Sequence, residues 1–397
     1  MKRFLLLALS LLSLHCGGGS GGGGSSTARI AVLTEGIYVH TGAGSGRVAI
    51  YEVGDGSLLK EHRPLFAPRG VAILGSGIAV ATDGTAIGLY RPLGAAVLHE
   101  ITPLGFEFLK TVCATSDPFE LVCADQALDR IVRFRILDDL SLDLVFDAPT
   151  GRSPRGLADD GQGGLWVACK NGNVGVDAGL PGFVVLHSSV DGRELARFET
   201  PFGCRGLALD LEGRAWVACF GDQKGAGDPG TGNLSTVVGL DPFGFRQEVE
   251  VGRGPFAIAC DVKGHKLVSC TVANELHRIE ADHTVRRGGG WPVAFDAVPE
   301  LARGGCTTVA LDGWGRIWVA FKLAPFLAVV DGETGALLRL VPVDARDRCE
   351  TLGDATGYSL ALLLFPSLDL DFDGVGNLDE LATGTNPFER LRRAPGG

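Results

Sequence analysis

The chain has 397 residues, of which 45% are hydrophobic, 21% are charged and 59 are glycine, and its formal net charge is −11. This length is ample for a large core, in one β-rich domain or in two smaller ones. The acidic balance argues against a nucleic-acid partner, because even non-specific binding to nucleic acid needs a basic surface.

The N-terminus predicts export. An apolar run over 4–14 is too short to span a bilayer stably. Cys16 follows it and leads into a Gly/Ser-rich tether over 17–27 that has few side chains with which to pack. This order resembles a bacterial lipoprotein signal, which implies a signal segment over 1–16, lipidation of Cys16, an outer-membrane or cell-surface location and membrane contact only through the lipid. His15 stands where that family prefers a small residue, so a periplasmic or secreted protein is the alternative.

Four stretches of the chain align, and each contains an apolar strand, an Asp-x-x-Gly turn and a second apolar strand. They are PRGLADDGQGGLWVAC from Pro154, CRGLALDLEGRAWVAC from Cys204, PFAIACDVKGHKLVSC from Pro255 and CTTVALDGWGRIWVAF from Cys306. The spacings of the turn aspartates are 50, 51 and 51 residues, from Asp160 to Asp210, Asp261 and Asp312. The tryptophans expected in the core of these units are Trp166, Trp216 and Trp318. Two more strand-like runs follow each pair, and four antiparallel strands in a unit of this length are typical of a β-propeller blade.

Weaker copies of the unit begin at Ala28, Pro68 and Val112. We therefore predict an all-β fold, a β-propeller of seven four-stranded blades over 28–343, with six or eight blades as alternatives because the first unit is short. The expected blades cover 28–63, 64–104, 105–150, 151–200, 201–250, 251–301 and 302–343, and 344–368 is interpreted as a connector. The pattern resembles NHL, YVTN and virginiamycin-lyase-like propellers, whose members include enzymes, scaffolds and ligand binders.

Three arginines stand at matching positions near the start of their units, Arg69, Arg155 and Arg205. In the propellers that the chain resembles, this segment enters the innermost strand beside the central channel, so the resemblance places the arginines at a channel mouth. Guanidinium groups there could bind a carboxylate or phosphate of a small-molecule or protein ligand. The alternative is that each arginine pairs with an aspartate of the neighbouring blade and only fixes the ring.

Binding or scaffolding at the bacterial cell envelope, by a monomer, is therefore the preferred interpretation of function. A lyase or lactonase with its site at the channel mouth is the second interpretation, and a purely structural envelope protein is the third. Catalysis is the less favoured because the histidines occupy no equivalent positions in the units and no nucleophile or phosphate-binding motif is visible. No catalytic residue is assigned.

Several cysteines follow the repeat. Cys204 and Cys219 are predicted at the same end of adjacent strands, and Cys113 and Cys123 flank a short hairpin in the same way. In an exported protein either pair can form a disulfide if its Cα atoms lie within about 7 Å. Buried free thiols are the alternative.

The stretch DLDFDGVGNLDE over 369–380 has the spacing of a calcium loop. Its Ca2+ ligands would be side chains of Asp369, Asp371, Asp373, Asn377 and Glu380, with the carbonyl oxygen of Val375. These carboxylates repel one another unless a cation lies among them, although a solvated acidic turn is the alternative. The following residues, LDELATGTNPFER, resemble bacterial thrombospondin type 3 repeats, which implies a calcium-binding repeat over 369–390. Extracellular calcium would keep even a weak site filled, so we expect a structural site rather than a sensor.

Overall fold

The computed structural model describes most of the repeat region. The described residues are 29–34, 47–52, 55–62, 70–74, 78–90, 97–103, 105–171, 180–221, 233–261, 263–312, 315–321, 323–342 and 359–362. Cys16, Arg69 and the predicted calcium ligands from Asp369 to Glu380 lie outside these ranges. Within them, the only helices are two short 3-10 turns, Phe295–Ala297 and Pro299–Leu301. No described helix is long and apolar enough to cross a membrane.

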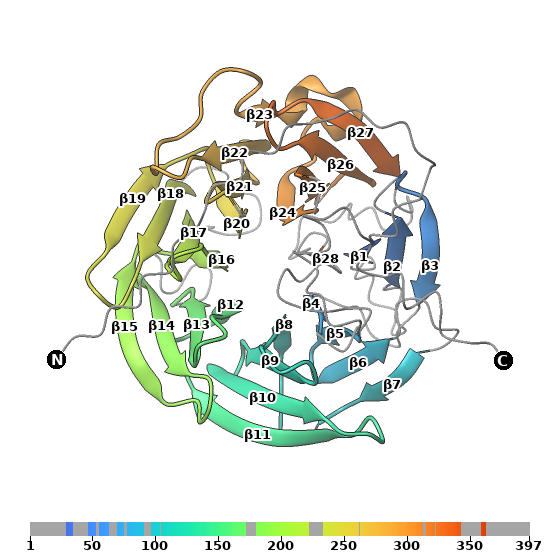
Figure 1. Cartoon of the computed structure of the whole chain (residues 1–397), viewed down its shortest axis with the longest axis vertical. Coiled ribbons are helices and arrows are strands. Elements are labelled where there is room, and N and C mark those ends of the chain that lie inside the picture. Colours follow the sequence, from blue (N-terminus) through green and yellow to red (C-terminus); the bar gives the residue numbers. More distant parts are fainter. Residues whose placement is uncertain are drawn as a thin grey trace, which may run out of the picture.

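The strands form seven four-stranded antiparallel sheets that stand side by side in a ring (Figure 1). From inside to outside, the first sheet contains β28 (Ser359–Leu362), β1 (Arg29–Thr34), β2 (Arg47–Glu52) and β3 (Leu58–His62). The second contains β4 (Gly70–Ile73), β5 (Ala79–Asp83), β6 (Ala86–Tyr90) and β7 (Val97–Ile101). The third contains β8 (Leu109–Ala114), β9 (Glu120–Asp125), β10 (Arg130–Ile136) and β11 (Leu142–Pro149). The fourth contains β12 (Pro154–Asp159), β13 (Gly164–Cys169), β14 (Gly182–Ser188) and β15 (Glu194–Thr200).

The remaining three sheets have the same meander order. The fifth contains β16 (Cys204–Leu209), β17 (Ala215–Gly221), β18 (Asn233–Leu240) and β19 (Arg246–Glu250). The sixth contains β20 (Pro255–Cys260), β21 (Lys266–Cys270), β22 (Glu275–Ile279) and β23 (Val293–Ala294). The seventh contains β24 (Cys306–Leu311), β25 (Arg316–Phe321), β26 (Phe326–Asp331) and β27 (Leu337–Pro342). Each innermost strand contacts the next around the ring, and β24 contacts β28 in turn, so the predicted all-β propeller is confirmed.

The ring is closed by a strand that the repeat pattern does not reveal. The first unit supplies only β1, β2 and β3, and its innermost position is filled by β28 from the stretch interpreted as a connector. β28 pairs antiparallel with β1, with Ile30 opposite Leu362 and Leu33 opposite Ser359. The first unit is therefore short because its fourth strand comes from the other end of the ring.

The Asp-x-x-Gly turns are held by the aspartate side chain. Asp312 Oδ1 accepts a hydrogen bond from the backbone nitrogen of Arg316 at 2.9 Å, and its Oδ2 accepts from Arg316 Nε at 2.6 Å and from Trp318 Nε1 at 3.1 Å. One carboxylate thus fastens the turn and orients the indole of the second strand. The turn geometry is set by residues close together in the chain, which explains why the unit is visible in the sequence.

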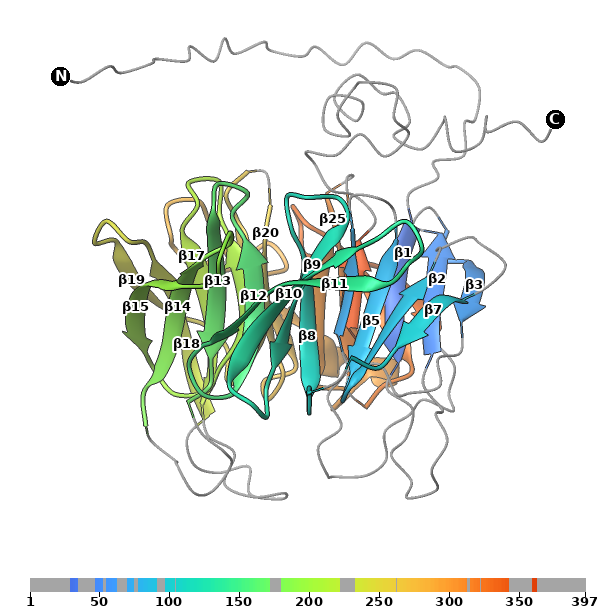
Figure 2. The same cartoon turned by 90° about the horizontal axis from the view of Figure 1, so that it is seen from below.

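The two faces of the ring differ, and Figure 2 shows the ring from the side. The turn face carries the Asp-x-x-Gly turns that join the first and second strands of the fourth to seventh sheets. The opposite face, here called the rim face, is where these innermost strands begin and the second strands end, as at Pro154 and Cys169. Apolar clusters fill the space between consecutive sheets, so second strands such as β13 and β17 are buried along their whole length. A strand covered on both sides needs apolar residues at every position, which the Trp-Val-Ala runs supply.

Candidate functional site

The innermost strands share an irregularity near the rim face. In β8, β12, β16, β20 and β24 the pairing with the second strand shifts just after its first residue. The residues at which the pairing shifts are Lys110, Arg155, Arg205, Phe256 and Thr307. A bulge of this kind redirects a side chain and locally ends regular pairing. Three consecutive sheets therefore place a basic residue at the same redirected position.

The basic positions of neighbouring sheets lie close together. The hydroxyl of Thr111 in β8 donates a hydrogen bond to the carbonyl oxygen of Arg155 in β12 at 2.6 Å. On the other side of β12, a Cβ atom added to Gly156 would come within 2.6 Å of the carbonyl oxygen of Arg205. Glycine is required at Gly156 because β12 and β16 approach so closely there. The sequence prediction that Arg155 and Arg205 share one end of the ring is consistent with this packing.

Aromatic rings hold several cations at the rim face. The guanidinium of Arg205 lies 4.3 Å from the ring centroid of Phe220 and 4.7 Å from that of Phe256. The two rings meet edge to face at 5.9 Å. The sequence did not predict these contacts, although Phe220 and Phe256 directly follow repeat positions. Such cation–aromatic contacts stabilise and orient a guanidinium without neutralising its charge.

Two lysines extend the same arrangement. Lys170 directly follows β13, is buried, and has its ammonium 5.9 Å from the ring centroid of Phe202. Lys110 in β8 is also buried and lies 5.5 Å from the ring centroid of Phe108. We call Lys110, Arg155, Lys170 and Arg205 the basic rim. These side chains come from three consecutive sheets of the ring.

A hollow adjoins the basic rim between the fourth and fifth sheets. It measures about 500 Å3 and is lined by Pro181, Glu199, Thr200, Pro201, Phe202 and Arg246. Phe202 links the two features, because its ring also carries the ammonium of Lys170. Arg246 donates to the carbonyl oxygen of Glu199 at 2.7 Å and so joins the two sheets across the hollow.

The sheet register pairs the cysteines of only one of the two predicted pairs. Each of the eight described cysteines is a free thiol. Cys204 stands directly opposite Cys219, and their Sγ atoms are 3.6 Å apart. Cys113 instead stands opposite Val122, so it lies on the opposite side of the sheet from Cys123. The hairpin between β8 and β9 sets this register, with Ala114 opposite Leu121, and the predicted Cys113–Cys123 bridge does not fit it.

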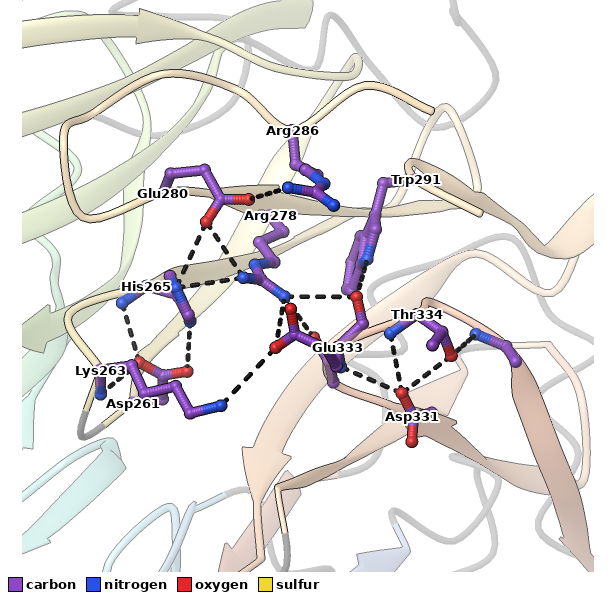
Figure 3. A network of polar contacts seen from close by, with 12 residues as sticks. Asp261, Lys263, His265, Arg278, Glu280, Arg286, Trp291, Asp331, Glu333 and Thr334 are labelled. Carbon is purple, nitrogen blue, oxygen red and sulfur yellow. Dashed lines mark hydrogen bonds and ion pairs between the residues drawn. The ribbon is translucent and has the colours of Figure 1, made fainter. Parts of the chain in front are cut away.

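A polar network on the turn face joins the sixth and seventh sheets (Figure 3). Arg278, almost fully buried in β22, donates to Glu280 Oε2 at 3.0 Å and to the carbonyl oxygen of Gly332 at 2.7 Å. His265 bridges Asp261 and Glu280 at 2.7 and 3.2 Å. The charge of Arg278 lowers the pKa of Glu333, which lies beside it. Arg278 thus connects two neighbouring sheets, the role that the sequence left open as the alternative for Arg69, Arg155 and Arg205.

A second buried cation lies between the fifth and sixth sheets. Lys266 is 1% exposed, its ammonium lies 4.6 Å from the ring centroid of Trp216, and it is 3.2 Å from Nδ1 of His283. Burial lowers the pKa of His283, and the charges of Lys266 and Arg214 lower it further. His283 is therefore held as a neutral hydrogen-bond acceptor for a buried ammonium.

Within the described ranges, no three His, Cys, Asp or Glu side chains are grouped so that they could hold a metal ion. The predicted calcium ligands are not among these residues, so the calcium loop stays a prediction.

No protein-family model matches the chain, and no curated protein sequence matches it. Solved structures do resemble it. A protein from Lactobacillus plantarum is 15% identical and covers 84% of this chain and 99% of its own, with a TM-score of 0.55. A catalytically inactive virginiamycin B lyase from Staphylococcus aureus, solved with quinupristin, is 14% identical and covers 70% and 85%, with a TM-score of 0.53. AztD from Citrobacter koseri is 11% identical and covers 85% and 98%, with a TM-score of 0.50. At these identities the likenesses show the fold alone, which is that of a β-propeller.

Proposed function

We propose that the protein is an exported β-propeller of the bacterial cell envelope that binds a ligand bearing carboxylate or phosphate groups at its rim face. The observation that carries this proposal is the basic rim, in which Lys110, Arg155 and Arg205 occupy the same bulged position of three neighbouring sheets. Arginine suits this role because its planar group can contact two oxygens of one anion at once.

The hollow beside the rim supports a binding role. Its volume of about 500 Å3 is within the range that small-molecule sites occupy. Its walls combine two prolines and a phenylalanine with the polar groups of Glu199, Thr200 and Arg246. A ligand with a short apolar part in the hollow and an anionic end toward Lys170 would use both features.

Binding of two anionic probes tests this function. Calorimetry with inorganic phosphate and with citrate should show binding to the wild-type protein. Arg205→Gln and Arg155→Gln should each weaken it about tenfold or more, because a charge-assisted hydrogen bond is lost. Arg193→Gln is the control, since Arg193 is 72% exposed on the turn face. Equal affinities for Arg205→Gln and Arg193→Gln would contradict the proposed site.

Measuring whether the protein converts a bound substrate distinguishes a binding role from a catalytic one. The solved lyase shares the propeller fold, and the fold alone is compatible with either role. A lyase or lactonase would convert a bound substrate at a rate that Arg155→Gln and Arg205→Gln reduce. A protein that binds the probes but converts no lactone or lyase substrate fits the binding role.

We also propose that Cys16 carries a lipid that anchors the propeller through the 17–27 tether. The support is the order of basic start, apolar run, cysteine and Gly/Ser tether in the sequence. Detergent phase partitioning of the protein expressed in a bacterium checks the anchor. The wild-type protein should enter the detergent phase and Cys16→Ser should stay in the aqueous phase, and unchanged partitioning would refute lipidation.

The loop over 369–380 is proposed to bind Ca2+ as a structural staple, and the support is its spacing of oxygen ligands. Limited proteolysis in calcium and in chelator, read by mass spectrometry of the C-terminal fragments, tests this role. Calcium should protect the segment in the wild-type protein, and the double variant Asp369→Asn, Glu380→Gln should lose that protection. Equal cleavage of the wild-type protein in both conditions would refute the site.

A further inference from the structure

We propose that Cys204 and Cys219 form a reversible disulfide beneath the basic rim, and that this bond tightens the binding of the anionic ligand at the rim. The placement of the two thiols supports the bond. Its effect on binding rests on the function proposed above.

The two thiols are placed for direct bonding. Cys204 in β16 is the register partner of Cys219 in β17, and both side chains are completely buried. Their Sγ atoms are 3.6 Å apart, whereas a disulfide bond is about 2.05 Å long. Small rotations of the two side chains can close a gap of this size without a change in strand pairing.

The pairing is specific to one sheet. The same two positions face one another in each of the last four sheets, with Pro154 opposite Cys169 in the fourth and Pro255 opposite Cys270 in the sixth. In the seventh sheet, Cys306 stands opposite Phe321. Among these four sheets only the fifth has cysteine at both positions.

Cys204 lies directly behind the wall of the hollow. Its Sγ is 2.8 Å from the hydroxyl oxygen of Thr200, a residue that lines the hollow. A Cβ atom added to Gly182 would lie 3.0 Å from the same Sγ, and the carbonyl oxygen of Pro201 lies 3.6 Å from it, so Thr200, Pro201 and a glycine are among the residues that cover the thiol on this side. A small oxidant in the hollow can therefore reach Cys204 after a local opening of this wall.

The chemistry requires an oxidant, which we identify as a low-molecular-weight disulfide. The hydrogen bond to Cys204 raises the pKa of the Cys219 thiol, and burial raises it further. Cys204, which lies beside Thr200 of the hollow, attacks one sulfur of the oxidant as a thiolate and expels the other sulfur as a thiolate. The Cys219 thiolate then attacks Cys204 in this mixed disulfide and expels the second thiolate. One S–S bond is broken and one is formed, two electrons pass to the oxidant, and the two protons end on its two thiol products.

The bond would act on the rim through the next residues in the chain. Arg205 follows Cys204, and Phe220, whose ring supports the guanidinium of Arg205, follows Cys219. Joining the two strands at this point restricts the separation of cation and ring. A guanidinium held in place before binding loses less freedom when a ligand arrives, so the oxidised protein should bind more tightly.

Alkylation and mass spectrometry test the bond. Reduced full-length protein is treated with oxidised glutathione at a pH of about 8.5, where thiolates form more readily, and is then alkylated under denaturing conditions. Peptides with Cys204 and Cys219 should become cross-linked and escape alkylation together. Cys113→Ser should leave this result unchanged, whereas Cys204→Ser and Cys219→Ser should each abolish it. Complete alkylation of both cysteines in the oxidised wild-type protein would overturn the proposal.

Titration with citrate tests the coupling. The oxidised wild-type protein should bind about fivefold more tightly than the reduced protein, and Cys219→Ser should show no response to the oxidant. Equal affinities of the two wild-type states, with the bond formed, would overturn the coupling. No binding in either state would contradict the proposed function and the coupling, while a cross-linked peptide would still establish the bond.

Discussion

The indole nitrogen of Trp216 donates a hydrogen bond of 2.8 Å to Oδ2 of Asp210, and both side chains are buried. The same carboxylate accepts backbone hydrogen bonds from Glu212 and Arg214 through Oδ1. The carboxylate of Asp210 therefore accepts hydrogen bonds both from the backbone of the turn and from the core tryptophan of the fifth sheet.

Asp210→Ala should destabilise the protein more than Asp160→Ala. Asp160 makes the same two turn contacts, but among the described residues the indole nitrogen of Trp166 has no hydrogen-bond partner that Asp160→Ala could remove. The difference should be about 1–3 kcal/mol, the cost of leaving a buried N–H group unsatisfied. Denaturant unfolding of the two variants measures it, and equal losses would show that the indole bond contributes nothing.

Stability should fall below a pH of about 6.5, the ordinary pKa of histidine, in part because of His283. Its pKa is lowered in the folded protein, so below this pH the unfolded chain binds more protons than the folded one. The facing groups are the cations Lys266 and Arg214, which lower the pKa, and the carboxylates Asp210 and Glu212, which raise it.

His283→Asn removes this titration and tolerates the positive φ of 70° at that position. Melting temperatures from pH about 7.5 to 5 should fall less steeply for His283→Asn than for the wild-type protein. His187 and His277, whose pKa values are also lowered by burial, are unchanged in both proteins and serve as the internal background. Parallel curves would show that His283 does not contribute to acid sensitivity.

Arg278→Ala should lower the free energy of unfolding by roughly 3–5 kcal/mol, the range for removing one partner of a buried ion pair. Arg286→Ala is the matched control, because Arg286 contacts the same Glu280 at 3.6 Å but is 45% exposed. Arg286→Ala should lower the free energy of unfolding by less than about 1 kcal/mol. The free energies of unfolding of the two variants decide this point, and similar values would mean that burial of Arg278 is not what makes the contact matter.

A chain ending at residue 358 should be much less stable than a chain ending at residue 362. The two differ only by β28, whose pairing with β1 completes the first sheet. Each lost backbone hydrogen bond costs about 1 kcal/mol, and β1 would lose its inner partner as well. Thermal unfolding compares the two, and equal melting temperatures would show that closure by β28 does not stabilise the ring.

Local patterns predicted the sheets well, because each unit carries its own turn chemistry. Asp210 and Asp312 contact residues only four to six positions away, so the spacing of the turns was enough to place the strands. β28 was missed because its partner β1 lies more than 300 residues away and the strand itself has only four residues.

The site was predicted less completely. Matching positions identified Arg155 and Arg205, but the rings around Arg205 come from β17 and from the next sheet, and no spacing rule relates them. The bridge between Cys113 and Cys123 failed for a different reason. Cys113 stands opposite Val122 and Val112 opposite Cys123, one residue away from the register that would pair the two cysteines, and one residue is enough to move a side chain to the other side of a sheet.

Closure by β28 has a consequence for how the protein is made. The first sheet needs strands from both ends of the ring, so a growing chain cannot finish this sheet until residue 362 has emerged. Until then β1 has an open inner edge that other extended chains could pair with. Folding of the first sheet is therefore delayed until its most distant strand is available.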